Sequence, residues 1–367
     1  MRILFYIYSL PVGGAEMIVT DYLEKLQSRG HEVCLVEDFH TDSFLTQRLL
    51  DTSIPVFTLW KGNISSPLGR RQKQAARMLG LHRRFDRILK TWQPDIVHFH
   101  GCPDHMDRLS FPRERMFYTF HSELHRNLRI LGEGNQARLQ TLCNGGLTIC
   151  ALTEDCAREC REIFHTDRVV YVPNGVDFSK VRSRTHSRTE IEALFGIPQD
   201  RFLVGTLGRL DPVKEHERLL AIFREVRQRR KNAVLLVVGG DCGGRLEKLR
   251  ALARELGLSQ DVVFTGQRQD ADAILAALDR FVLTSRTESF SLVSIEAQAL
   301  GVPCILSDAV PKEVACENCL RLSLSESDST WAQAILAPPS GTHTGSLGAF
   351  DLDAVIDTLE KTYRSRL

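Results

Sequence analysis

The chain has 367 residues, of which 43% are hydrophobic and 25% charged, an ordinary globular composition without the long Gly, Pro or Ser runs of a disordered arm. Its 47 basic and 46 acidic residues leave a net charge of +1, so no overall field attracts a polyanion, and we expect no nucleic-acid partner. No apolar stretch approaches the roughly 18 residues of a membrane span. We therefore expect a cytoplasmic protein whose contact with the inner membrane surface is at most peripheral.

The first half alternates short apolar runs with amphipathic segments, which is the pattern of strand–helix units in a parallel sheet. A strand at residues 3–8 leads into a helix at 15–27 that stops at Gly30. Further strands are expected at residues 31–37, 95–100, 115–120, 146–152 and 169–172. The set predicts a sheet of about six or seven strands that ends near Pro173.

Turn-forming residues at 173–177 separate this half from a second one. The alternation of apolar runs and amphipathic segments begins again after this turn. Helices are expected at residues 217–230 and 245–256. The further apolar segments are 203–208, 233–239, 262–265, 279–284, 296–300 and 303–307. We predict an N-terminal domain of residues 1–172 and a C-terminal domain of residues 173–350, both α/β and doubly wound. A helical stripe from residue 351 to the end at 367 is expected to pack back on the first domain, after a surface crossover at 337–350.

Two glycines, Gly13 and Gly14, follow the first predicted strand. They let the backbone approach a ligand, and the helix that follows offers N–H groups and a partial positive charge to a phosphate. A plain tight turn explains them equally well. Because no G-x-G-x-x-G fingerprint follows, an NAD-dependent oxidoreductase is disfavoured.

Two cations, Arg209 and Lys214, lie between a buried strand and the next helix of the second half. Open α/β sheets bind ligands at this carboxyl edge. The planar fork of Arg can bind two phosphate oxygens and Lys adds a mobile charge, so the pair can neutralise a leaving pyrophosphate without a metal. Taken alone, the motif is also consistent with ordinary surface charges.

Two acids, Glu288 and Glu296, are eight residues apart after another apolar strand. With the first in a loop and the second on the early turns of a helix, both can face one ligand and accept hydrogen bonds from hydroxyl groups. The intervening residues present backbone N–H groups to a phosphate at the helix N-terminus, namely Ser289, Phe290, Ser291 and Leu292. The alternative is a helix-entry acid at Glu288 and a surface acid at Glu296.

Together these motifs resemble the retaining glycosyltransferases of family 4, which have the GT-B fold of two Rossmann-like domains facing across a cleft. The resemblance rests on the Glu-x7-Glu segment, the Gly-Arg-x4-Lys segment and the Gly-Gly-Ala-Glu loop, in the family's order. It covers nearly the whole chain and is strongest from residue 172 to 314. Within the family, the chain is similar to enzymes that build bacterial capsule and exopolysaccharide.

The resemblance implies roles for these residues. Arg209 and Lys214 hold the donor diphosphate, Glu288 contacts hydroxyls of the transferred sugar, and Glu296 binds the ribose. Gly13 and Gly14 lie near the sugar and phosphate. The residues expected beside the nucleotide and its base are Gly240 and Arg268.

Histidines end two predicted strands of the first half. The family likeness places His121 beside the reacting sugar, as a catalytic residue with Glu288 and the cationic pair. His98 and His100 point to one sheet face, but no third ligand is evident, and we predict no metal. The Cys156/Cys160 and Cys316/Cys319 spacings also lack a second pair, and most thiols, such as Cys34, Cys150 and Cys304, lie in apolar segments, as expected of reduced core thiols.

The predicted reaction moves a hexose or N-acetylhexosamine from a nucleotide-diphospho-sugar to a glycan or lipid-linked acceptor, in capsule, exopolysaccharide or lipopolysaccharide synthesis. A UDP-sugar is favoured over a GDP-sugar as the co-substrate, and no cofactor is expected. The family likeness implies retention by front-face attack, with the departing phosphate deprotonating the acceptor. A nucleotide-sugar epimerase and a non-catalytic sugar-nucleotide-binding protein remain alternatives.

One further feature is a concentration of basic residues before the predicted strand at residues 95–100. It either forms a solvated helix face or meets a phosphate-rich surface such as a membrane. The residues are Arg70, Arg71, Lys73, Arg77, Arg83, Arg84 and Arg87.

Overall fold

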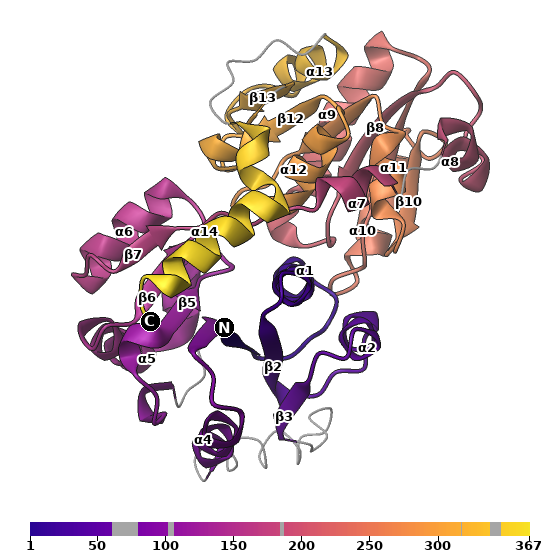
Figure 1. Cartoon of the computed structure of the whole chain (residues 1–367). Coiled ribbons are helices and arrows are strands. Elements are labelled where there is room, and N and C mark those ends of the chain that lie inside the picture. Colours follow the sequence, from indigo (N-terminus) through magenta and orange to yellow (C-terminus); the bar gives the residue numbers. More distant parts are fainter. Residues whose placement is uncertain (61–79, 102–105, 184–186, 317, 338–345) are drawn as a thin grey trace. The chain divides into compact units, whose positions relative to one another are not determined.

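The computed structural model describes residues 1–60, 80–101, 106–183, 187–316, 318–337 and 346–367 (Figure 1). The chain divides into two compact units, one formed by Met1–Gly175 with Leu352–Leu367 and the other by Val176–Asp351. Each contains a parallel sheet with helices on both faces, which confirms the predicted α/β class with two Rossmann-like domains. Most of the predicted crossover and four of the basic residues lie outside the described residues, namely Arg70, Arg71, Lys73 and Arg77.

The described residues of the first unit form a seven-stranded parallel sheet in the order β3-β2-β1-β4-β5-β6-β7. Because the strand order reverses between β1 and β4, the carboxyl ends of these two strands are where such a sheet binds ligands. The strands are β1 (Arg2–Ile7), β2 (Glu32–Phe39), β3 (Val56–Trp60), β4 (Ile96–His100), β5 (Met116–Thr119), β6 (Thr148–Ala151) and β7 (Val169–Tyr171).

Helices cover both faces of this sheet, because successive residues of each strand point to opposite sides. Leu4 and Tyr6 of β1 lie in one core with helices α4 (Leu81–Trp92), α5 (Leu124–Asn144) and α6 (Glu154–Phe164). Helices α1 (Gly14–Ser28), α2 (Phe44–Asp51) and α14 (Leu352–Arg364) lie together on the other side.

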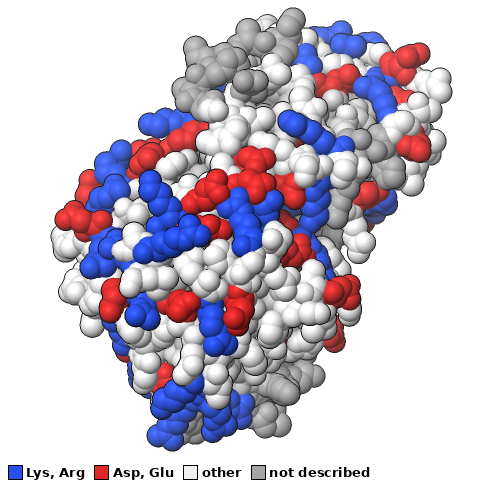
Figure 2. Space-filling view, viewed as in Figure 1, with Lys and Arg blue, Asp and Glu red and all other residues white. Residues whose placement is uncertain are grey.

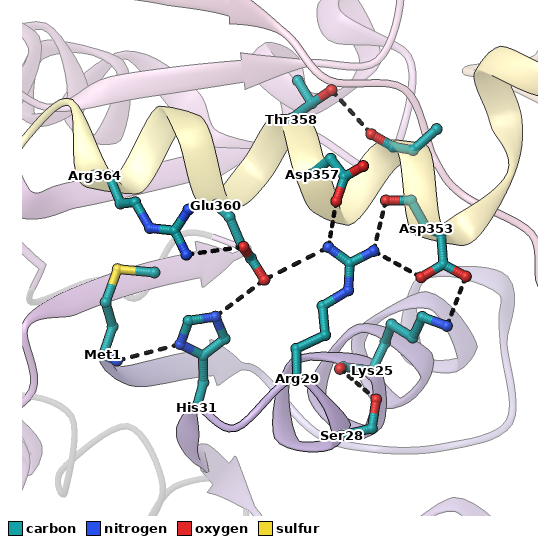
Figure 3. A network of polar contacts seen from close by, with 11 residues as sticks. Met1, Lys25, Ser28, Arg29, His31, Asp353, Asp357, Thr358, Glu360 and Arg364 are labelled. Atoms are coloured by element: carbon teal, nitrogen blue, oxygen red, sulfur yellow. Dashed lines mark hydrogen bonds and ion pairs between the residues drawn. The ribbon is translucent and has the colours of Figure 1, made fainter.

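The C-terminal helix α14 is attached to α1 by a network of ion pairs, shown in Figure 3. Arg29 donates to Asp353 at 2.6 Å and to Asp357 at 2.5 Å, and Lys25 pairs with Asp353 at 2.7 Å. His31, which follows α1, contacts Glu360 at 3.0 Å. These ion pairs join segments far apart in sequence and add to the burial of Ile356, Leu359 and Tyr363, through which α14 belongs to the first unit.

The described residues of the second unit form a six-stranded parallel sheet in the order β10-β9-β8-β11-β12-β13. The order reverses between β8 and β11, so the loops after these two strands emerge side by side. The strands are β8 (Phe202–Leu207), β9 (Ala233–Val238), β10 (Val262–Gly266), β11 (Arg280–Leu283), β12 (Cys304–Ser307) and β13 (Cys319–Leu322).

Trp331 and Phe223 are fully buried in the core on one face of this second sheet. That core joins helices α9 (His216–Arg229), α10 (Arg245–Glu255) and α13 (Asp328–Leu336). The remaining helices contact one another and are α7 (Phe178–Ser183), α8 (Arg188–Leu194), α11 (Ala271–Ala276) and α12 (Leu292–Ala299). The apolar segment at 296–300 is mostly part of α12, which agrees with the helix expected to carry Glu296, while β3 and β13 are strands that the sequence pattern did not predict.

Candidate active site

Two loops meet at the reversal point of the second sheet. The loop after β8 runs through a short 3₁₀ turn at Pro212–Lys214, and the loop after β11 runs from residue 284 to 291. The backbone N–H of Arg286 donates to the carbonyl of Val213 at 2.8 Å. Segments about 70 residues apart in sequence are thereby held together, because their strands are neighbours.

Lys214 and Glu288, two of the predicted site residues, are in direct contact. The Lys214 Nζ donates to Glu288 Oε1 at 2.5 Å, and the Oγ of Ser285 donates to the same oxygen at 2.6 Å. The lysine side chain is 21% exposed and that of the glutamate 10%. A cation and an acid that the sequence assigned to different parts of the ligand therefore form one partly buried ion pair.

Hydroxyl groups at the ends of β11 and β12 hold this pair in place. Thr284 Oγ1 donates to the carbonyl of Lys214 at 3.1 Å, and Ser307 Oγ donates to the carbonyl of Ser285 at 2.6 Å. All three hydroxyl residues are buried. The sequence analysis did not select them, although two hydroxyl residues directly after an apolar strand are a usable signal for this edge of the sheet.

Close packing of two glycines holds the loop after β8 against the loop after β9. A Cβ on Gly239 would lie 1.8 Å from the carbonyl oxygen of Gly208, so no side chain fits there. The backbone N–H of Leu210 donates to the carbonyl of Gly240 at 3.0 Å. These contacts bring predicted Gly240, after β9, beside the loop that carries Arg209 and Lys214.

Arg209 is exposed, and within the described residues it forms no ion pair. Its guanidinium is therefore available to an anion without first leaving a protein carboxylate. Arg268 is different, because it already donates to both oxygens of Asp270 at 2.8 and 2.6 Å and lies 5.6 Å from the centroid of the Phe195 ring. Its role beside a base stays a prediction.

The N-terminus of α12 follows the Glu288 loop. Ser291 has a left-handed backbone with φ of 76° and does not cap the helix, and its hydroxyl lies 2.7 Å from that of Ser294. Phe290 is buried, with its ring 5.3 Å from that of Phe350, so its side chain stabilises the core and only its backbone can face a ligand. Three further predicted residues, Ser289, Leu292 and Glu296, are half-buried here.

In the first unit, Gly13 precedes α1 and Gly14 is its first residue. A Cβ on Gly13 would lie 2.3 Å from Glu16 Oε2, so the glutamate side chain folds back over the glycine. The loop follows β1 at the reversal point of this sheet. The two glycines thus occupy the edge where the sequence predicted them, and their contact with a donor stays a prediction.

Three histidines form a stack on one face of the first sheet. The His98 and His100 ring centroids are 4.3 Å apart, and those of His100 and His121 are 5.0 Å apart. His98 is hydrogen-bonded through Nδ1 to Tyr363 at 2.6 Å and through Nε2 to Thr119 at 2.8 Å. Both of its ring nitrogens are therefore used inside the unit.

His100 and His121 are hydrogen-bonded to each other, with His100 Nδ1 and His121 Nε2 2.7 Å apart. Burial lowers the pKa of His98 to about 3 and of His121 to about 4, and it lowers the pKa of His100 well below its usual value. All three rings are therefore neutral near pH 7. His121, which is half-buried, can offer a hydrogen bond but no positive charge to a ligand.

The sequence analysis also did not select Glu37, a buried acid near the carboxyl end of β2. Glu37 accepts from Thr58 Oγ1 at 2.8 Å and lies 3.1 Å from His40 Nδ1. Burial raises the pKa of this carboxyl. The signal in the sequence is an acid inside an apolar strand, where a carboxyl is uncommon.

Among the residues that the structure describes, no three His, Cys, Asp or Glu side chains are grouped so that they could hold a metal ion. Cys156 and Cys160 have sulfur atoms 4.0 Å apart, and burial raises the pKa of the Cys150 thiol to about 12.

No helix in the described part of the chain is long and apolar enough to cross a membrane.

Two models of known protein families match the chain, each over most of one unit. The family model described as Glycosyltransferase Family 4 matches residues 12–180, and the one described as Glycosyl transferases group 1 matches residues 187–319. The chain belongs to the family 4 glycosyltransferases. The second match contains the loops that carry Lys214 and Glu288, and the first contains Gly13, Gly14 and the three stacked histidines.

Relatives of this family 4 chain include EpsF of Bacillus subtilis, 34% identical over 51% of this chain and 49% of the relative. A D-inositol 3-phosphate glycosyltransferase of Saccharomonospora viridis is 34% identical over 46% of this chain and 41% of the relative. The matched stretch thus spans about half the length of such relatives or less.

Solved structures confirm the GT-B fold. Alr3699/HepE of Anabaena, crystallised with UDP and glucose, has a TM-score of 0.74 at 20% identity, with both chains covered completely. A glycosyltransferase of Rickettsia africae has a TM-score of 0.77 at 15% identity, covering 100% of this chain and 98% of the other.

Proposed function

We propose that the chain transfers a hexose or N-acetylhexosamine from a nucleotide-diphospho-sugar to a glycan or lipid-linked acceptor, with retention of configuration. The observation that carries the proposal is the Lys214–Glu288 ion pair beside an exposed Arg209, at the reversal point of the second sheet. Membership of family 4 and the likeness to EpsF support a role in the synthesis of a polysaccharide.

Charge development explains why this arrangement suits glycosyl transfer. As the anomeric C–O bond breaks, negative charge grows on the diphosphate and the sugar becomes positive. Arg209 and Lys214 meet the growing negative charge, while Glu288 accepts hydrogen bonds from sugar hydroxyls. Because the two cations stabilise the leaving group, we propose that the reaction needs no metal.

The donor is proposed to be a UDP-sugar. Support comes from HepE, a protein of the same fold that was crystallised with UDP-glucose. His121, neutral at pH 7, is proposed to donate a hydrogen bond to the transferred sugar. The acceptor hydroxyl is proposed to attack the same face from which the phosphate leaves, with that phosphate taking its proton.

The test measures donor consumption and product configuration. The purified chain is incubated with UDP-glucose, UDP-galactose, UDP-N-acetylglucosamine and the GDP-sugars, with and without extracted lipid-linked oligosaccharides. NMR of the product gives the configuration of the new bond. Acceptor-dependent formation of an α-linked product from an α-linked donor supports the proposal, and an inverted product contradicts retention.

Other outcomes identify the alternatives. Interconversion of the donor into another sugar nucleotide without any acceptor would establish an epimerase. Binding of donors without turnover on any acceptor would favour a non-catalytic binding protein. Loss of transfer after treatment with EDTA, restored by a divalent cation, would contradict metal independence.

A further inference from the structure

Positive charge is concentrated in one segment of the first unit. Residues 61–92 contain nine basic residues and one acidic residue, a net charge of +8, whereas the whole chain carries +1. The other residues together therefore carry −7. Such asymmetry in an otherwise balanced protein indicates a surface that meets an anionic partner.

The described part of this segment is helix α4, and its rotation about its own axis is fixed by buried side chains. Leu81, Phe85 and Leu89 are buried in the core of the first unit. The Phe85 ring lies 5.7 Å from that of Tyr6 and 6.0 Å from that of Phe99. The opposite side of α4 must therefore face outwards.

The outward side is basic. We call the four exposed cations of this helix the basic face of α4: Arg83, Arg84, Arg87 and Lys90. In the described residues none of them forms an ion pair, and the one acid of the helix, Asp86, accepts a hydrogen bond from the backbone N–H of Ser110 at 2.8 Å. Figure 2 shows basic side chains gathered at the lower end of the view, where Figure 1 places α4.

The spacing of these cations lets them act together. Seven residues along a helix span about 10 Å, which is close to the distance over which salt at ~0.1 M screens charges. An extended anionic surface can therefore contact all four at once, whereas a single phosphate cannot. The apolar side of α4 is occupied by the core, so the contact is electrostatic and involves no insertion of the helix.

We infer that the basic face of α4 docks the chain on an anionic lipid bilayer. A bilayer is favoured over nucleic acid because the remainder of the chain is negative and would be repelled by a polyanion that surrounds it. The inference goes beyond the proposed function, and it connects with it because a lipid-linked acceptor lies in such a bilayer. The transferase would then meet its acceptor by moving along a surface.

The test compares two triple variants of the full chain with the unmodified protein. R83S/R87S/K90S removes three charges from the basic face and leaves Arg84, which donates to the carbonyl of Leu59 at 2.7 Å. R224S/K248S/R254S removes three exposed charges from the second unit and serves as the matched control. Binding is measured by co-sedimentation with vesicles of phosphatidylglycerol and phosphatidylcholine, and with vesicles of phosphatidylcholine alone.

The unmodified chain should bind the anionic vesicles, release from them as salt is raised, and ignore the neutral ones. Each removed charge should weaken binding about fivefold, so the α4 variant should bind roughly a hundredfold less tightly. The control should bind like the unmodified chain. Equal loss in both variants, or equal binding to neutral vesicles, would overturn the inference, as would tighter binding to a short DNA duplex.

Two further measurements separate this inference from the proposed function. Thermal unfolding must be unchanged in the α4 variant, and its affinity for UDP in calorimetry must match that of the unmodified chain. Intact UDP binding without vesicle binding by the unmodified chain would overturn membrane docking alone. Vesicle binding without UDP binding would leave docking in place and contradict the transferase.

Discussion

Lys214 Nζ and Glu288 Oε1 are 2.5 Å apart at the reversal point of the second sheet. The cation that we propose binds the diphosphate is therefore already paired with the acid that we propose binds the sugar. A donor that supplies both groups can exchange this one contact for two, one to each partner. Under the proposed function, the ion pair couples recognition of the phosphate to recognition of the sugar.

Replacing Glu288 with Gln tests this coupling. The variant keeps an oxygen for Ser285 to donate to but removes the charge that holds Lys214. We expect UDP affinity to stay or to rise by up to about fivefold, while turnover falls about 10- to 100-fold because a charged hydrogen bond to the sugar is lost. Calorimetry and initial rates measure the two effects. A matched fall in affinity and turnover would move Glu288 from the sugar to the nucleotide.

Replacing Arg209 with Ala should weaken UDP binding by about 2 to 4 kcal/mol, the loss expected for a charge-assisted contact to phosphate. This variant is cleaner than Lys214→Ala, which would leave the partly buried Glu288 without its cation. Arg224→Ala, an exposed residue of α9 in the same unit, is the control for general charge effects. Calorimetry with UDP that gives the same affinity for Arg209→Ala and for the control would remove Arg209 from the site.

Ser285 is expected to position Glu288, because its hydroxyl donates to the carboxylate that also binds Lys214. Ser285→Ala should lower kcat about tenfold with little change in the KM for donor. Ser307→Ala is the control, since it removes the bond to the Ser285 carbonyl and leaves the Ser285 hydroxyl intact. It should lower stability by about 1 kcal/mol and keep kcat. If both variants lose activity in proportion to stability, Ser285 has a structural role only.

The parts of this site that follow from the sequence are those with local causes. Glycines in the loops after strands, cations before a helix and acids near a helix start can all be recognised as candidate site residues from their neighbours in sequence. Arg209 and Glu288 are examples. The Lys214–Glu288 contact joins residues 74 positions apart and depends on β8 lying next to β11, which no local pattern specifies. For the same reason, the sequence did not predict the contact of His98 with Tyr363.

Two strands, β3 and β13, escaped prediction. β3 has five residues, of which only Leu59 is fully buried, and β13 has four, including Arg321. Each lies at an edge of its sheet, where half-exposed residues weaken the apolar signal. The central strands are buried on both faces, and their continuous apolar runs were recognised.

His98 should make the stability of the first unit depend on pH. Burial lowers its pKa from 6.5 to about 3, so below pH 6.5 the unfolded chain binds a proton that the folded chain does not. Its contribution is complete above pH 6.5 and is lost as the pH falls toward 3. Between pH 7 and pH 5 the loss should be about 2 kcal/mol. Denaturant titrations at several pH values measure it.

Two variants identify the titrating group. His98→Gln should remove the part of the pH dependence that His98 causes and leave the part due to His100 and His121, so that the difference in stability from the unmodified chain narrows by about 2 kcal/mol from pH 7 to pH 5. Tyr363→Phe loses the hydrogen bond to His98 but keeps the ring, and it should retain the pH dependence. Parallel curves for His98→Gln and the unmodified chain would show that another group titrates.

Arg29 connects α1 with the C-terminal helix, and its replacement tests how much that network stabilises the first unit. Its side chain is 22% exposed, whereas its partners Asp353 and Asp357 are 57% and 71% exposed. Because water screens such partners, Arg29→Ala should cost only about 1 kcal/mol, and less at high salt. Arg158→Ala breaks an exposed pair with Asp155 within α6 and should cost close to nothing. Equal effects of the two variants in denaturant titrations would mean that the ion pairs in Figure 3 do not hold α14 in place.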